Sequence, residues 1–306
     1  MPEIDAVQLN FSAQNLLLLN VSLGFIMFGV ALNLTTEDFA RLVRNPKPAL
    51  VGVASQFLLL PVLTFGLVWV LRPTPSIALG MILVAACPGG NISNFMSMNA
   101  QGNTALSVTL TAVSTVLAIV LTPINLSFWG GLYPPAASIL TTVDVSFWRV
   151  FKTVTLILGF PIVLGMSVRH VAEDLAKRLC QGMQALSIAI FVIIVIFALR
   201  ANFDYLIGYL GVVFDLVLLH NALALAAGYQ LAYWAHLPVP DRQTLALETG
   251  IQNSGLGLIL IFNFFDGLGG MAVVAGWWGV WHILSGLGLS FYWRSQKSPF
   301  FAPQWT

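Results

Sequence analysis

Charged residues are scarce in this chain. Asp, Glu, Lys and Arg together make up 8% of its 306 residues, whereas a soluble domain carries about 25%. The composition therefore excludes a soluble globular protein. The net charge is +1 and no basic block is present, so nucleic acid and other polyanions are not expected as partners.

Cysteine and histidine are also rare, with two Cys and four His residues. Cys87 lies in an apolar run and Cys180 in a short polar stretch, so we expect two free thiols rather than a disulfide framework. His, Cys and carboxylate residues do not cluster at metal-ligand spacing. We therefore expect no enzyme, and an intramembrane hydrolase or transferase is a distant alternative.

Apolar residues dominate what is present: they make up 58% of the chain, and the mean hydropathy is +0.87. Apolar runs of about 20 residues predict transmembrane helices, so we expect an all-α polytopic membrane protein embedded in the lipid bilayer. The predicted spans number about nine and lie near residues 14–33, 48–71, 77–97, 104–132, 147–169, 184–200, 206–235, 242–263 and 270–293.

The distribution of basic residues predicts the orientation in the membrane. With the N-terminus outside and the C-terminus in the cytoplasm, nine of the 13 Lys and Arg residues fall on the inner side, as the positive-inside rule requires. The first residues include Glu3 and Asp5 and lack the basic region of a signal peptide. We expect a multi-pass protein of a bacterial inner membrane rather than a plastid envelope.

The chain contains a weak internal repeat, although no linker separates it into domains. We expect one domain over residues 1–306, built from inverted repeats at about 14–140 and 147–293. Each half contains a glycine-interrupted, amide-rich break inside an apolar span, at residues 88–94 (PGGNISN) and 250–255 (GIQNSG). Paired interrupted spans in two halves point to the binding site of a secondary transporter.

Glu248 precedes the second break, inside an apolar span. A carboxylate at that depth costs about 2.5–3.5 kcal/mol on insertion scales and marks a functional site by default. Unwound carbonyls and the side chains of Ser93, Asn94 and Gln252 would offer hard oxygen ligands for a small cation, while half-helix N-termini would attract an anion. A cation-coupled anion carrier is the best interpretation. The plainer interpretation is that the breaks are only kinks in two helices, and that their Ser and Asn side chains form hydrogen bonds between helices.

Several motifs in order resemble those of the bile acid:sodium symporter family, which includes the apical sodium-dependent bile acid transporter and its bacterial homologues. The resemblance covers nearly the whole chain and includes Gln56, Pro61 and several short runs. These runs are residues 29–34 (GVALNL), 87–94 (CPGGNISN), 102–107 (GNTALS), 219–221 (LHN), 248–256 (ETGIQNSGL) and 281–282 (WH).

This resemblance implies a panel of helices packed beside a core in which two broken helices cross, and two co-transported sodium ions. The first implied ion site uses Ser93, Asn94, Ser107, Thr111 and Glu248. The second uses Gln56, Glu248, Gln252 and the backbone carbonyls of Thr249 and Ile251. The implied substrate contacts are Gly90, Asn91, Asn253 and His282.

The family's best-known bacterial members have ten helices, whereas about a dozen residues precede the first span here, so we expect the nine-helix form. The family's cargo includes bile salts, pantoate and pyruvate, so we expect a small organic anion, bile-acid-like or a small carboxylate, and no obligate protein partner. A proton-coupled carrier in which Glu248 takes up the proton is the nearer alternative. A channel is a third, which paired broken repeats favour less.

Overall fold

The computed structural model describes residues 4–6, 8–9, 13–143, 146–179 and 203–296, with isolated positions between 180 and 202. Within these ranges the chain is helical and contains no strand, only two isolated β-bridges. The predicted class, an all-α polytopic membrane protein, is confirmed.

The helices follow one another with short connections. In chain order they are η1 (Ile4–Ala6), α1 (Ala13–Ala31), α2 (Thr36–Arg44), α3 (Pro46–Ala54), the π-turn η2 (Ser55–Leu59), α4 (Leu60–Leu71), α5 (Pro75–Ala86), α6 (Ile92–Asn99), α7 (Thr104–Leu132), α8 (Pro134–Thr142), α9 (Phe147–Val154), the π-turn η3 (Thr155–Gly159), α10 (Phe160–Val171), α12 (Phe203–Trp234), α13 (Val239–Gly250), α14 (Ser254–Phe264) and α15 (Gly269–Gln296).

Within the described residues, five continuous helical spans are long and apolar enough to cross a membrane. They are Pro46–Leu71, Thr104–Leu132, Phe147–Val171, Gly211–Trp234 and Gly269–Gln296, and shorter apolar helices cover Leu16–Ala31, Pro75–Ala86 and Ser254–Phe264. The predicted spans 77–97 and 242–263 are each broken in two, into α5 and α6 and into α13 and α14. Eight of the predicted spans therefore correspond to helices, and the sixth, 184–200, lies outside the continuously described ranges.

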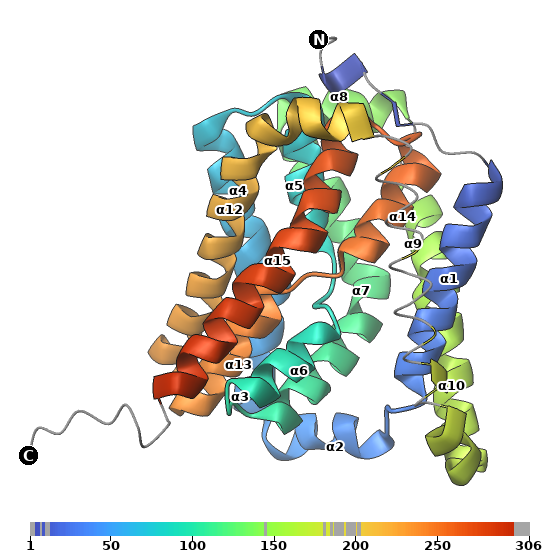
Figure 1. Cartoon of the computed structure of the whole chain (residues 1–306), viewed down its shortest axis with the longest axis vertical. Coiled ribbons are helices and arrows are strands. Elements are labelled where there is room, and N and C mark those ends of the chain that lie inside the picture. Colours follow the sequence, from blue (N-terminus) through green and yellow to red (C-terminus); the bar gives the residue numbers. More distant parts are fainter. Residues whose placement is uncertain are drawn as a thin grey trace, which may run out of the picture.

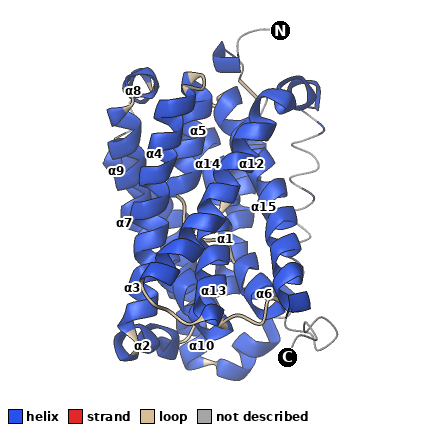
Figure 2. Ribbon diagram, turned by 90° about the vertical axis from the view of Figure 1, so that its left-hand side faces the viewer, coloured by secondary structure: helices blue, strands red, loops and turns tan. Residues whose placement is uncertain are grey.

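The spans form two groups, which are visible in Figure 1; the two groups overlap in the view of Figure 2. We call α1 together with the span from α9 to α10 the panel, and the other described spans the core. In Figure 1 the half-helices α5 and α14 occupy the upper half of the core, whereas α6 and α13 occupy the lower half. The upper end of the molecule carries α8 and the lower end carries α2. The two breaks consequently meet near mid-height.

A π-turn interrupts the span from α3 to α4 and has an identifiable cause. Pro61 has no backbone N–H, so it cannot donate a helical hydrogen bond to the carbonyl of Phe57. Asn125 of α7 donates to that carbonyl instead, at 3.2 Å. π-turns of this kind are frequent at functional sites, and this one contains Gln56, whose side chain is buried.

Close backbone packing joins α12 to α13, directly behind Glu248. A Cβ atom on Gly228 would lie 2.5 Å from the carbonyl oxygen of Leu245 and 2.8 Å from Oγ1 of Thr249. Only glycine fits at this contact, so the helices could not approach as closely with any other residue.

Gly228→Ala is expected to destabilise the protein by about 1–3 kcal/mol, since the added methyl group overpacks against backbone that has no room to move. The measurement is the melting temperature of purified protein in detergent. Gly211→Ala, in the same helix, is the matched control because nothing lies within 4 Å of its added methyl. That control should melt at the same temperature as the parent protein or slightly higher. Equal melting of the two variants would contradict the packing argument.

Candidate functional site

The two helix breaks cross and are joined through their backbones. The N–H of Gly90 donates to the carbonyl of Ile251 at 2.7 Å, and the N–H of Asn253 donates to the carbonyl of Pro88 at 2.8 Å. Gly89 and Gln252 form an antiparallel bridge between these two bonds. The non-helical backbone of each break is thus satisfied by the other, which allows both to lie deep in the protein.

Two glycines allow the breaks to come close together at the crossing. A Cβ atom on Gly89 would lie 3.1 Å from Oε2 of Glu248, and one on Gly90 would lie 3.1 Å from the carbonyl oxygen of Gln252. These contacts are tighter than ordinary van der Waals distances, so a larger residue would displace either the Glu248 carboxylate or the backbone of the other break.

Side chains from neighbouring helices cap the carbonyl ends of both upstream half-helices. Thr122 of α7 donates to the carbonyl of Ala86 at 2.7 Å, and Asn221 of α12 donates to the carbonyl of Gly250 at 2.8 Å. Ser285 of α15 in turn donates to Oδ1 of Asn221 at 2.6 Å. No role was predicted for Thr122 or Ser285 from the sequence, and Asn221 belonged only to a motif of the family. The one available signal was a polar residue within an apolar helix.

Glu248 lies at the end of α13, 5% exposed, and accepts hydrogen bonds from three hydroxyl groups. Ser93 of α6 and Ser107 of α7 each donate to Oε1 at 2.5 Å. Thr111 lies 3.1 Å from Oε2 and 3.3 Å from Oε1, and also donates to Oδ1 of Asn94 at 3.2 Å. We call these five residues the first cluster; they are the residues of the first implied ion site.

A second cluster of amides lies on the other side of the crossing. Nε2 of Gln56 lies 2.8 Å from both the carbonyl of Cys87 and Oε1 of Gln252. Nε2 of Gln252 donates to the carbonyl of Thr249 at 2.7 Å and to Oε1 of Gln56 at 3.2 Å. The second cluster comprises Gln56, Gln252 and the carbonyls of Thr249 and Ile251, and it extends by a hydrogen bond between Thr249 and Ser55 at 2.7 Å.

A small cavity of about 10 Å³, roughly the space of one water-sized particle, is lined by Glu248 of the first cluster and Gln56 of the second. Its lining residues are Gly52, Val53, Gln56, Leu110, Ser114 and Glu248. Glu248 therefore faces both the hydroxyls of the first cluster and the amide of Gln56. Ser114 was not predicted from the sequence and lies too close to Thr111 in the chain for its polarity to single it out.

Three of the four predicted substrate residues lie at the helix breaks, and the fourth, His282, does not. Asn91 precedes the first turn of α6, and its Oδ1 is buried with no hydrogen-bond partner among the described residues. Asn253 caps α14, accepting from the N–H of Leu256 at 3.0 Å. Gly90 lies at the crossing, whereas His282 is buried in α15 without a hydrogen bond that joins it to either cluster.

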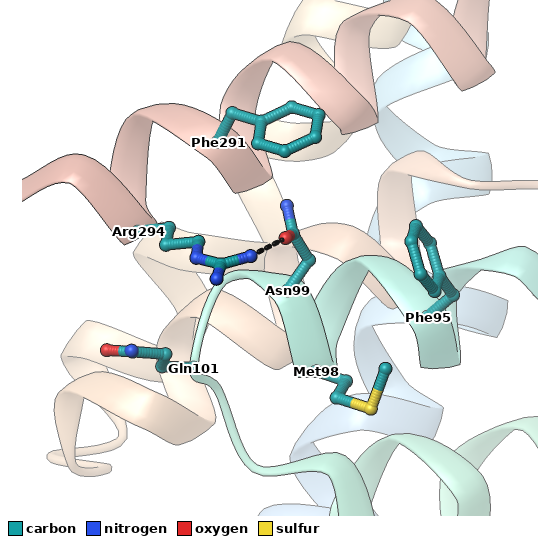
Figure 3. A pocket seen from close by; sticks show the side chains of 6 residues that line it. All are labelled: Phe95, Met98, Asn99, Gln101, Phe291 and Arg294. Atoms are coloured by element: carbon teal, nitrogen blue, oxygen red, sulfur yellow. Dashed lines mark hydrogen bonds between the residues drawn. The ribbon is translucent and has the colours of Figure 1, made fainter.

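A larger cavity of about 480 Å³ opens at the lower end, between the ends of α6 and α15 (Figure 3). Its apolar lining comes from both helices, with Phe95 and Met98 on α6 and Phe291 on α15. Arg294 donates to Oδ1 of Asn99 at 2.9 Å, and Asn99 donates to Ser290 at 2.9 Å. This cavity was not predictable from the sequence, since it depends on how the two helix ends face each other.

The ligand chemistry of the crossing is that of oxygen alone. Across the part of the chain that the structure describes, no group of three or more His, Cys, Asp or Glu residues could hold a metal ion. The two clusters instead offer hydroxyl, amide and carbonyl oxygens around one carboxylate. Unwound backbone carbonyls and half-helix ends of this kind coordinate sodium in membrane transporters.

Two broken helices that cross at a buried carboxylate, inside a helical membrane protein, define the class as an ion-coupled secondary transporter. Comparison with known proteins supports this class. Residues 20–209 match the Sodium Bile acid symporter family, and the chain belongs to that family. It is a sodium-coupled transporter of the bile acid symporter type, as the motifs indicated.

Relatives in bacteria, plants and animals are similar over most of this chain. The uncharacterised sodium-dependent transporter YocS of Bacillus subtilis is 35% identical over 91% of this chain and 83% of its own length. The probable chloroplastic sodium/metabolite cotransporter BASS2 of rice is 30% identical over 92% of this chain, and human sodium/bile acid cotransporter 4 is 31% identical over 77%. The matched regions span only 65% of the rice protein and 54% of the human one.

Proposed function

We propose that this protein is a symporter that moves one organic anion with two sodium ions by alternating access. The observation that carries the proposal is the position of Glu248 at the helix crossing, in contact with the first cluster and facing the second across a shared cavity. One carboxylate there can serve two cations.

The first sodium ion would bind in the first cluster, which consists of Ser93, Asn94, Ser107, Thr111 and Glu248. Three hydroxyl groups of this cluster already point at the carboxylate. A hydroxyl oxygen has two lone pairs as well as its proton, so each can rotate and present a lone pair to a cation. The carboxylate then supplies the charge and the hydroxyls complete the shell.

The second sodium ion would bind between Glu248 and the second cluster, whose members are Gln56, Gln252 and the carbonyls of Thr249 and Ile251. The amides of Gln56 and Gln252 bond each other and nearby carbonyls. Both side-chain amides carry an oxygen that can turn towards a cation in the shared cavity.

Charge balance explains why an anion would accompany the ions. Two sodium ions and one carboxylate leave one positive charge in a buried site, which is unfavourable unless it is compensated. The N-termini of α6 and α14 start at the crossing and carry partial positive charge. We propose that the anion binds there, against Gly90, Asn91 and Asn253, with His282 as a more distant contact.

We propose that the anion is bile-acid-like or a small carboxylate and that it moves into the cell. The names of the relatives include both metabolite and bile acid cotransporters, so they support the class of organic anions and no single cargo. The predicted topology, with the N-terminus outside a cell inner membrane and the C-terminus in the cytoplasm, belongs to the same proposal.

A sodium-dependent thermal shift tests this function. The purified protein in detergent is melted with taurocholate, pantoate or pyruvate, in sodium chloride or in potassium chloride. A ligand that binds only the folded protein raises its melting temperature by mass action. We expect one anion to stabilise the protein in sodium far more than in potassium. Equal stabilisation in both salts would reject sodium coupling and favour the proton-coupled alternative.

A further inference from the structure

A pair of asparagines joins the panel to the core. Asn20 of α1 and Asn263 of α14 are 243 positions apart in the chain and bond each other in both directions. Nδ2 of Asn20 donates to Oδ1 of Asn263 at 3.3 Å, and Nδ2 of Asn263 donates to Oδ1 of Asn20 at 3.0 Å. Asn263 also donates to the carbonyl of Ile259 at 2.8 Å, which fixes its orientation.

The pair joins two helices that both reach the upper end of the molecule (Figure 1). Asn20 is in the first half of α1, which begins at the upper end, and Asn263 is in the last turn of α14, which ends there. The larger cavity lies at the opposite end, between α6 and α15 (Figure 3). The asparagine contact between panel and core is thus made above the helix crossing, while the cavity below the crossing lies within the core.

The chemistry of the pair is unusual for its surroundings. Neighbouring residues on the same helices, such as Leu19, Leu23 and Leu260, are buried and apolar. Apolar side chains in this position would favour only the closed arrangement, because separation would expose them to water. Paired amides satisfy each other when the helices touch and bind water when they part. They suit a contact that must open and close.

We infer that Asn20 and Asn263 form a latch that holds the upper end of the transport pathway closed and that must release once in each cycle. This inference rests on the proposed alternating access. A hydrogen bond between membrane helices shifts an equilibrium by roughly threefold on average. Two such bonds would therefore favour the closed upper end by about tenfold, a bias that can be reversed in every cycle.

Cross-linking tests the latch directly. Asn20→Cys and Asn263→Cys are combined with Cys180→Ser, while Cys87 is retained because its side chain is fully buried. The protein in proteoliposomes is treated with a short bifunctional methanethiosulfonate. Uptake of radioactive sodium, driven with taurocholate or pyruvate, should fall to background and return after reduction. The two proteins that carry only one of the introduced cysteines, treated alike, are the matched controls and should keep their activity.

A double-mutant cycle gives an independent readout. Asn20→Ala and Asn263→Ala should each improve the apparent affinity for sodium applied from the upper side, by up to about tenfold. The double variant should show little further change, because either substitution alone breaks the pair.

The outcomes separate the latch from the transport proposal. Uptake that continues at the parental rate in the cross-linked protein would overturn the latch, as would additive effects in the cycle. Failure of the unmodified protein to take up sodium with either anion, or with pantoate, would instead reject the proposed function.

Discussion

Glu248→Ala is expected to abolish sodium-dependent anion uptake, lowering its rate at least a hundredfold. Removing the charged partner of a buried ion costs about 3–5 kcal/mol, and here the same carboxylate faces both clusters. The measurement is uptake of radioactive sodium and of the stabilising anion into proteoliposomes. Both fluxes should be lost together, since neither ion site keeps a negative charge.

Two further variants show whether charge is the cause. Glu248→Gln keeps the size of the side chain and an oxygen that accepts hydrogen bonds, so it should remain folded and yet transport no better than Glu248→Ala. Glu173→Gln is the control for loss of an acid. Glu173 is exposed, and its hydrogen bond from Lys177 lowers its pKa, so its replacement should leave uptake intact. Sodium-dependent uptake by Glu248→Gln would remove this carboxylate from the ion sites.

Gln56→Ala is expected to raise the sodium concentration required for half-maximal uptake about tenfold, and to lower the Hill coefficient from near two towards one. Gln56, a member of the second cluster, donates hydrogen bonds to Gln252 and to the carbonyl of Cys87. It makes no hydrogen bond to the hydroxyl groups of the first cluster. Loss of one such interaction is worth about 1–1.5 kcal/mol. The measurement is the sodium dependence of the initial rate at a saturating concentration of the anion.

Ser107→Ala is the matched variant in the first cluster. It removes one hydroxyl from Glu248 and leaves the amides of Gln56 and Gln252 in place. Each single variant should weaken one ion site, and the double variant should weaken both. A Gln56→Ala protein with parental sodium dependence would show that the second ion does not use this residue.

Much of this architecture was predictable because it follows from local chemistry. Long apolar runs indicated the spans, and the sequences around Pro88 and Gly250 indicated the breaks, since proline and glycine disrupt helices. Glu248 stood out because an acid is costly inside a membrane. The motifs then grouped Ser93 and Gln56 with it, and the structure brings both near its carboxylate.

The rest could not be predicted because it depends on which helices are neighbours and how each is rotated. Thr122 and Asn221 cap the broken helices from α7 and α12, and nothing near them in sequence indicates their partners. Asn125 compensates for Pro61 from a different span. The inverted relation between the halves stays a prediction, as does the sixth span, 184–200, which lies outside the described residues.

A break in a helix is usually its most deformable point, but here the two breaks stiffen each other. The bonds from Gly90 to Ile251 and from Asn253 to Pro88 tie both into one short ladder. The amide protons of Gly90 and Asn253 should therefore exchange with deuterium as slowly as those of the surrounding helices, despite the irregular backbone. The crossing would then stay rigid while the protein moves, and the connections outside the crossing would have to bend during transport.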